Sequence, residues 1–101
     1  MTKTIMLACA GGMSTSLLVT KMIAAAKAEK IDVNIFATAS SAIPLEADTH
    51  HPSVILLGPQ IQFLLDNIIK EVDVPVEVIN MKDYGTMNGK NVLHQAMKLV
   101  N

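Results

Sequence analysis

The sequence predicts one α/β domain in which an open, four-stranded parallel sheet lies between two layers of helices. Three observations support this fold class. Apolar runs of strand length occur four times, and stretches with helical spacing of apolar residues alternate with them. Gly, Pro or polar loop residues separate these segments. With 101 residues, half of them apolar, the chain can form one compact core but not two.

Chain order and handedness then predict the topology. Strands that are joined by helical crossovers run parallel, and such crossovers are right-handed. For four successive β–α units we expect the strand order 2-1-3-4, by analogy with doubly wound folds. We expect a single domain over residues 1–101, without an internal repeat or a linker.

The first unit has the clearest pattern. Thr4 to Ala10 is a continuous apolar run, which is typical of a strand buried on both faces. Gly11 and Gly12 end it, and hydroxyl side chains then precede a helix predicted from about Ser14 to Lys30. Polar and apolar residues alternate from Asp32 to Ala37, which predicts a second strand at a more exposed edge.

The middle of the chain combines a connector with a third unit. For Ser40 to Pro52 we predict a connector with at most a short helix around residues 45–47. Ser53 to Gly58 is a buried-strand run, and Pro59 suits the first turn of a helix. The apolar residues of that helix share one stripe, which should pack on the sheet: Ile61, Leu64, Leu65, Ile68, Ile69 and Val72.

The last unit contains a short strand and an amphipathic helix. Val74 to Ile79 is predicted as the fourth strand, and an irregular loop should follow through Tyr84 and Gly85. The final helix should begin at about Asn88. Its apolar face consists of Val92, Leu93, Ala96, Met97 and Val100.

Composition limits the classes of partner. The formal net charge is −1, without the basic excess that binding to nucleic acid or to an anionic membrane by charge would need. The apolar run near the N-terminus is shorter than a signal peptide or a spanning helix, so we expect a cytoplasmic protein.

Cys9 is the only cysteine, which excludes an internal disulfide and a Cys-rich metal site. We expect no metal and no cofactor.

Cys9 comes where a ligand should bind in this topology. Doubly wound sheets bind ligands beyond the carboxyl ends of their strands, where the chain order reverses, and here that is the end of the first strand. The next residues open a helix, whose unpaired N–H groups and dipole attract an anion and favour a thiolate. We therefore predict phosphoryl chemistry at Cys9, with a phosphate-binding loop of Ala10, Gly11, Gly12, Met13, Ser14, Thr15 and Ser16.

A purely structural role for Cys9 is the competing interpretation. A cysteine in a short apolar strand is usually a small buried hydrophobe, and Gly-Gly before Ser-Thr-Ser can be a turn with a helix cap. The functional interpretation is favoured because a nucleophile, a glycine loop, a group of hydroxyls and a helix start coincide at the predicted ligand site.

The sequence also resembles a known family. Cys9 to Val19, followed by Lys21 and Met22, is similar to the active loop and first helix of the IIB components of the lactose/cellobiose class of the bacterial phosphotransferase system. The similarity continues in Val54 to Gln60, Pro75 to Ile79 and Tyr84-Gly85. The loop of this chain is more glycine-rich than the Cys-Ser-Ala-Gly version of the family, which should loosen it.

The resemblance implies that the protein is a phosphotransferase enzyme, a phosphoryl carrier in sugar transport. Cys9 would accept a phosphoryl group from a phosphohistidine of the IIA component. It would donate the group to a cellobiose-like disaccharide that enters through the membrane component IIC. We expect a monomer, because nothing in this cycle needs an oligomer. Cellobiose, lactose and diacetylchitobiose all stay open as the sugar.

The main alternative is a hydrolase similar to the low-molecular-weight cysteine phosphatases, which share this flavodoxin-like architecture. Such enzymes carry an arginine six positions after the cysteine, where this chain has Thr15, and the chain contains no arginine. A nucleotide-binding P-loop is disfavoured because Gly-Lys-Ser/Thr does not follow Gly11-Gly12. A receiver-type regulatory module is disfavoured because the third strand ends in Leu57-Gly58 and not in an aspartate.

The remaining polar candidates receive no role from the sequence. Adjacent His50 and His51 in a Pro-flanked connector should face solvent, and His94 should lie at the border of the last apolar face. Whether Asp83 or Tyr84 contributes to the site stays open.

Overall fold

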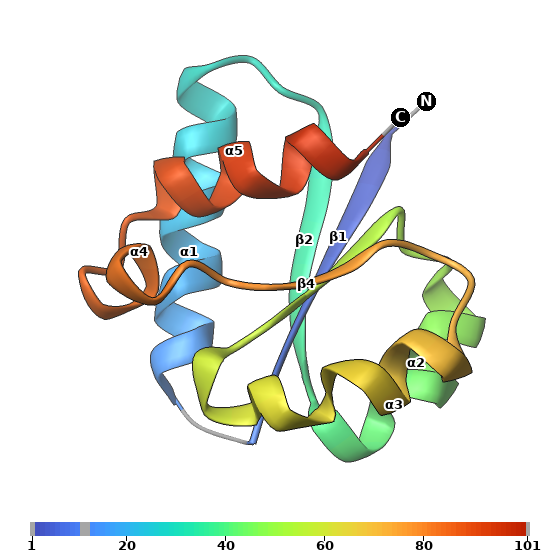
Figure 1. Ribbon diagram of the computed structural model, residues 1–101. Helices are drawn as coiled ribbons and strands as arrows, with labels where there is room; N and C mark the ends of the chain where they lie inside the picture. Colours follow the sequence, from blue (N-terminus) through green and yellow to red (C-terminus); the bar gives the residue numbers. More distant parts are fainter. Residues whose placement is uncertain (1, 11–12, 101) are drawn as a thin grey trace.

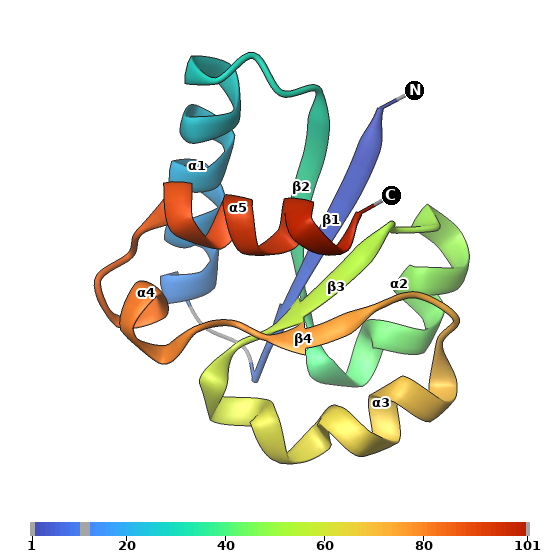
Figure 2. The same ribbon diagram turned by 45° about the horizontal axis from the view of Figure 1, so that its top comes forward.

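The computed structural model of the chain describes residues 2–10 and 13–100, and its sheet confirms the predicted fold class. All neighbouring strands are parallel, and their order is β2-β1-β3-β4. The strands are β1 (Lys3–Cys9), β2 (Val33–Ala39), β3 (Val54–Leu57) and β4 (Val76–Val78). Figure 2 shows β1 in the interior of the sheet, with β2 on one side and β3 and β4 on the other.

Helices cover both faces of this sheet (Figure 1). On one face lie α1 (Met13–Ala28) and α5 (Gly89–Leu99); on the other lie α2 (Ile43–His50) and α3 (Leu65–Glu71). Three more short helices occur in the described residues: η1 (Ser40–Ala42), η2 (Pro59–Leu64) and α4 (Met81–Gly85). No helix in the described part of the chain is long and apolar enough to cross a membrane.

Successive side chains of β1 enter two different cores, because side chains alternate between the faces of a strand. Ile5 and Leu7 pack with α1 and α5, whereas Met6 and Ala8 pack under α2, η2 and α3. All four are fully buried. The absence of polar alternation in this segment of the sequence therefore reflects burial on both sides.

The connector after β2 is more helical than predicted. It contains η1 and the eight-residue helix α2, where the sequence predicted at most a short helix around residues 45–47. Ile43 begins α2 and is fully buried in the core that contains Met6 and Ala8 of β1. Tertiary packing therefore stabilises a helix that shows little apolar periodicity of its own. Pro44 is tolerated because it lies in the first turn.

The segment after β3 is not the one continuous helix that the apolar spacing predicted. It begins at Pro59 as expected, but it consists of η2 and α3, with non-helical backbone angles at Ile61 (φ −117°, ψ 23°). A 3₁₀ turn has about 3.0 residues, so it changes the phase of the apolar stripe. As a result Ile61 and Ile68 are buried, whereas Ile69 is 49% exposed, and the prediction for Ile69 was wrong.

The prediction of an irregular loop through Tyr84 and Gly85 is also wrong, because this segment forms α4. The side-chain oxygen of Asn80 accepts hydrogen bonds from the backbone N–H groups of Lys82 and Asp83, at 3.0 and 3.1 Å. This cap satisfies donors that a helix start leaves unpaired.

The last helix agrees with its prediction. It begins at Gly89, after Asn88, whose side chain accepts a hydrogen bond from the N–H of Asn91 at 3.0 Å. Its predicted apolar face is directed into the core: Val92, Leu93 and Ala96 are fully buried, and Met97 and Val100 pack against them.

Candidate functional site

Cys9 is the last residue of β1 and lies at the carboxyl edge of the sheet, as predicted. It pairs in register with Ala39 of β2, and the N–H of Gly58 donates a hydrogen bond of 2.8 Å to the carbonyl oxygen of Ala8. The chain leaves β1 through α1 on one face and leaves β3 through α3 on the other, so Cys9 lies where the chain order reverses. Only 7% of Cys9 is exposed.

The predicted phosphate-binding loop is described in part. Ala10 is exposed, and Gly11 and Gly12 lie outside the described residues. Helix α1 starts at Met13, so Met13, Ser14 and Thr15 form its first turn. Because the first N–H groups of a helix have no partner within it, this turn can bind an anion next to the end of β1. Ser16 is exposed and follows in the second turn.

Thr15 is only 2% exposed, whereas Ser16 after it is exposed. Its hydroxyl oxygen lies 3.4 Å from the hydroxyl oxygen of Tyr84, and the Nε2 group of Gln60 donates a hydrogen bond of 3.0 Å to that same Tyr84 oxygen. These three side chains come from α1, η2 and α4, which follow β1, β3 and β4 respectively. The network therefore connects the segments that leave three strands at one edge of the sheet.

Gly58 places Gln60 beside Cys9. A Cβ atom at position 58 would lie 2.7 Å from Oε1 of Gln60 and 3.7 Å from Cβ of Cys9. The backbone at Gly58 has a φ of −60°, which any residue can adopt, so space and not backbone freedom favours glycine here. Cys9 and the Gln60 carboxamide thus flank the same small volume.

The sequence did not single out Gly58 or Gln60, although both belong to the Gly58-Pro59-Gln60 turn after the third strand. The sequence could have indicated these two residues only through their place in the predicted topology. A turn at the carboxyl end of the strand next to β1 must lie close to Cys9. The sequence left open whether Tyr84 contributes to the site, and in the structure its hydroxyl lies 3.4 Å from that of Thr15.

The histidines are not brought together with Cys9. His50 lies 3.0 Å from Glu46 on the same helix and packs on the ring of Phe36. His51 is exposed, and Nε2 of His94 on α5 lies 2.7 Å from Glu29. Among residues 2–10 and 13–100, no group of three or more His, Cys, Asp or Glu side chains could hold a metal ion.

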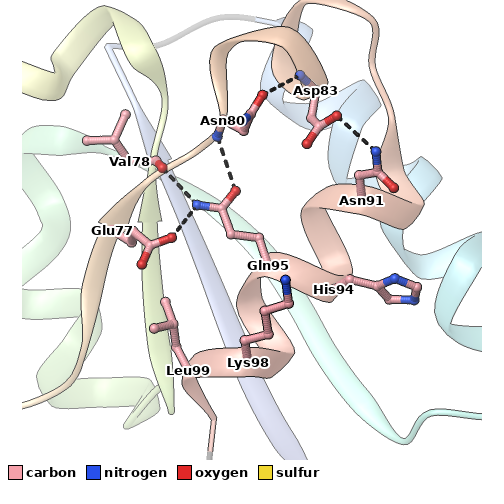
Figure 3. A pocket seen from close by; sticks show the side chains of 9 residues that line it. All are labelled: Glu77, Val78, Asn80, Asp83, Asn91, His94, Gln95, Lys98 and Leu99. Atoms are coloured by element: carbon pink, nitrogen blue, oxygen red, sulfur yellow. Dashed lines mark hydrogen bonds between the residues drawn. The ribbon is translucent and has the colours of Figure 1, made fainter.

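Asp83 faces a polar groove between β4, α4 and α5 (Figure 3). Its carboxylate accepts a hydrogen bond of 3.0 Å from the side-chain amide of Asn91. In the same groove, Nε2 of Gln95 donates to the Val78 carbonyl at 2.8 Å, and Oε1 of Gln95 accepts from the Asn80 N–H at 3.1 Å. These contacts hold the turn between β4 and α4.

Comparison with known proteins decides the family. The family model described as "PTS system, Lactose/Cellobiose specific IIB subunit" matches residues 4–95. The chain belongs to this family. It is a IIB component of a lactose/cellobiose-type phosphotransferase system, and thus a phosphotransferase of sugar uptake that works with IIA and IIC components. The phosphatase alternative is not favoured.

Three relatives match this IIB protein over nearly their full length. The galactose-specific EIIB component of Lactococcus lactis subsp. cremoris is 45% identical, in an alignment that covers 98% of this chain and 97% of the relative. The cellobiose-specific EIIB component of Lactococcus lactis subsp. lactis has the same identity and coverage. The oligo-beta-mannoside-specific EIIB component of Bacillus subtilis is 41% identical, covering 97% of this chain and 96% of the relative.

Two solved structures share the fold. The solution structure of the cellobiose-specific IIB protein from Borrelia burgdorferi has a TM-score of 0.83 and 39% identity, with 100% of this chain and 94% of that chain covered. The lactose-specific IIB domain from Streptococcus pneumoniae has a TM-score of 0.84 and covers both chains completely. At 14% identity, this second similarity shows the fold alone.

Proposed function

We propose that Cys9 is the residue of this IIB component that carries the phosphoryl group. The observation that supports this role is its position. The only cysteine of the chain ends β1, directly before the segment that leads into α1 and six residues before the buried Thr15. A thiolate at such a point is a nucleophile beside an anion-binding helix start.

Two transfers then make up the cycle. The Cys9 thiolate attacks the phosphorus atom of a phosphohistidine on IIA, so an S–P bond forms and the N–P bond breaks, leaving its electron pair on the histidine nitrogen. A sugar hydroxyl next attacks the phosphorus of phosphocysteine. The S–P bond breaks, the thiolate is regenerated, and the hydroxyl proton passes to a base in the complex with IIC.

The phosphoryl group would be held by neutral donors. It carries a charge of roughly −1.5 to −2, by analogy with phosphate esters. We assign its binding to the N–H groups and hydroxyls of the loop from Ala10 to Ser16, with the dipole of α1. The chain contains no arginine, and without a guanidinium clamp the transfer to water is not promoted. This suits a carrier, whose phosphoryl group must survive until the sugar arrives.

The sugar would be a β-linked disaccharide such as cellobiose. Two relatives that are equally similar to this chain, at 45% identity, are named for galactose and for cellobiose. Such a difference at equal identity supports a choice of sugar made by the membrane component and not by IIB. We further infer that residues 1–101 act as one domain, as a cytoplasmic monomer that meets IIA and IIC in turn.

Intact-mass analysis tests the role of Cys9. The protein is incubated with phosphoenolpyruvate, the two general phosphotransferase proteins and a candidate IIA, in parallel with the Cys9→Ser variant. We expect one phosphoryl adduct on the wild type and none on Cys9→Ser, because a serine hydroxyl stays protonated and is a far weaker nucleophile. Circular dichroism of both proteins checks that the variant keeps its fold.

Two results would contradict the proposal. One is an adduct on Cys9→Ser, which would place the phosphoryl group elsewhere. The other is hydrolysis of an aryl phosphate by the wild type alone, dependent on Cys9, with no adduct from any IIA. That second result would indicate a phosphatase.

A further inference from the structure

We infer that Tyr84 and Gln60 are positioning residues that orient the Thr15 hydroxyl, so that its proton is directed to the phosphoryl group on Cys9. This inference rests on the proposed role of Cys9. It adds to that role a specific neutral donor and the two side chains that aim it.

The hydrogen bonds of the network have a preferred direction. The Nε2 group of Gln60 is a donor only, so the Tyr84 oxygen accepts its hydrogen bond. Tyr84 has one proton of its own, and the Thr15 oxygen lies within reach at 3.4 Å. We assign the Tyr84 proton to Thr15. The Thr15 hydroxyl then keeps its own proton for another acceptor.

The position of Thr15 suits that donor role. Thr15 is in the first turn of α1, six residues after Cys9, where the predicted loop has its anion-binding N–H groups. Its side chain is almost completely buried, and a buried hydroxyl held by one neighbour has few orientations left. A donor that is already oriented loses little entropy when the phosphoryl group arrives.

A second observation places the network next to the sulfur-bearing residue. The Oε1 atom of Gln60 and the Cβ atom of Cys9 both lie near the point where a Cβ of residue 58 would be, at 2.7 and 3.7 Å. The network therefore starts beside Cys9 at η2, crosses to α4 through Tyr84, and returns to the first turn of α1 through Thr15.

Both the ring and the backbone of Tyr84 are fixed by contacts outside the network. Its ring packs against the core between the sheet and α1 and α5, and its N–H donates to the Asn80 carbonyl at 2.9 Å. Asn80 is in turn fixed by Gln95, which also bonds the carbonyl of Val78 (Figure 3). Tyr84 is thus attached to β4 through a rigid turn, as a residue that orients another side chain needs to be.

Single-turnover kinetics with phosphorylated IIA test this inference. The variant Tyr84→Phe keeps the packed ring and removes only the hydroxyl. Rapid-quench measurements give the maximal rate of transfer to Cys9, here called kcat, and the concentration of IIA at half of that rate, here called KM. We expect kcat to fall about tenfold, the effect of losing one hydrogen bond in the transition state. KM for IIA should change by less than about twofold, because docking is not altered.

Thr15 variants distinguish positioning from packing. Thr15→Val should lower kcat about as much as Tyr84→Phe, whereas Thr15→Ser, which restores the hydroxyl, should recover most of it. The double variant Tyr84→Phe/Thr15→Val should lose no more than Thr15→Val alone, because both changes interrupt one chain of hydrogen bonds. Thr20→Val is the matched control, since Thr20 is an exposed threonine of the same helix that bonds the Ser16 carbonyl.

Three results would overturn the inference: a wild-type kcat in Tyr84→Phe, equal losses in Thr15→Ser and Thr15→Val, or additive losses in the double variant. Gln60→Leu provides a second variant if Tyr84→Phe does not fold, with the same expected fall in kcat. Cys9→Ser separates the two proposals. A wild-type kcat in Tyr84→Phe with no adduct on Cys9→Ser refutes the positioning role alone, whereas an adduct on Cys9→Ser refutes the role of Cys9.

Discussion

Gly58 shows how much one residue contributes to the site. A Cβ at this position would lie near both Cys9 and the carboxamide of Gln60, and the Gly58 N–H donates a hydrogen bond to the Ala8 carbonyl near the end of β1. A side chain at this position would compete with Gln60 for the same space. Glycine therefore allows the third strand's turn to approach Cys9 closely.

We predict that Gly58→Ala slows phosphoryl transfer while leaving the fold intact. The new Cβ would lie 2.7 Å from Oε1 of Gln60, so Gln60 must rotate away from Tyr84. The group displaced is the end of a flexible side chain, so the free energy of unfolding should change by less than about 1 kcal/mol. Urea unfolding and the transfer rate from phosphorylated IIA measure the two effects.

Gly85→Ala is the matched control for that prediction. Nothing lies within 4 Å of a Cβ built at Gly85. Its transfer rate should equal that of the wild type. A wild-type rate in Gly58→Ala as well would show that the space beside Cys9 has no part in transfer.

At the scale of single residues, the sequence indicated the nucleophile but not its neighbours. Cys9 could be placed because an apolar run, a glycine pair and a helix start follow one another in the chain. Gln60 and Tyr84 could not be paired in advance, since 24 residues separate them and their hydrogen bond exists only after the sheet has formed.

At the scale of elements, α4 is the segment that sequence patterns missed. It has five residues and no buried side chain, so it shows no apolar periodicity. Its stability comes from the Asn80 cap and from the turn that Gln95 holds. The site depends on it because it carries Tyr84.

We predict that Asn80→Ala lowers the free energy of unfolding by about 1 kcal/mol, the usual cost of losing a helix cap. The Ala side chain cannot accept the hydrogen bonds of Lys82 and Asp83. Asn80→Asp keeps an acceptor oxygen and should stay close to the wild type. Chemical denaturation compares the three proteins, and equal destabilisation by Ala and Asp would mean that the cap is not the stabilising contact.

The other elements explain where periodicity succeeds and where it fails. The apolar face of α5 is regular enough to identify both the helix and its buried side. The stripe after β3 was read as continuous, and the 3₁₀ turns of η2 moved Ile69 to the surface. The exposure of Ile69 therefore depends on the backbone geometry at Ile61, whose side chain packs in the same core as Met6 and Ala8 of β1.

At the scale of the whole molecule, α5 packs closely against α1, with its first residue near the α1 backbone. A Cβ atom at Gly89 would lie 2.5 Å from the backbone carbon of Lys21 and 2.7 Å from its oxygen and from the nitrogen of Met22. Backbone atoms of a helix cannot move aside as a flexible side chain can. The missing side chain of Gly89 thus sets how near the two helices come on the face that supports the site.

We predict that Gly89→Ala lowers the free energy of unfolding by about 1–3 kcal/mol, the usual range for an overpacked contact. An alanine would favour an isolated helix by about 0.5–1 kcal/mol, but the clash with backbone exceeds this gain. Thermal unfolding against wild type and Gly85→Ala measures the difference. Equal or higher stability of Gly89→Ala would contradict the close packing of α1 and α5.

The sequence by itself determined the fold class, the strand order, the end of β1 as the position of Cys9, and the family. The fold class and the position of Cys9 follow from local signals, since apolar runs, glycine breaks and helix starts consist of consecutive residues. The strand order follows from the analogy with doubly wound folds, and the family from a resemblance along most of the chain. Only the tertiary structure decided which side chains surround Cys9. The carboxyl ends of parallel strands gather distant segments at one edge of the sheet, so Gly58, Gln60 and Tyr84 meet there through packing that no single stretch of the chain encodes.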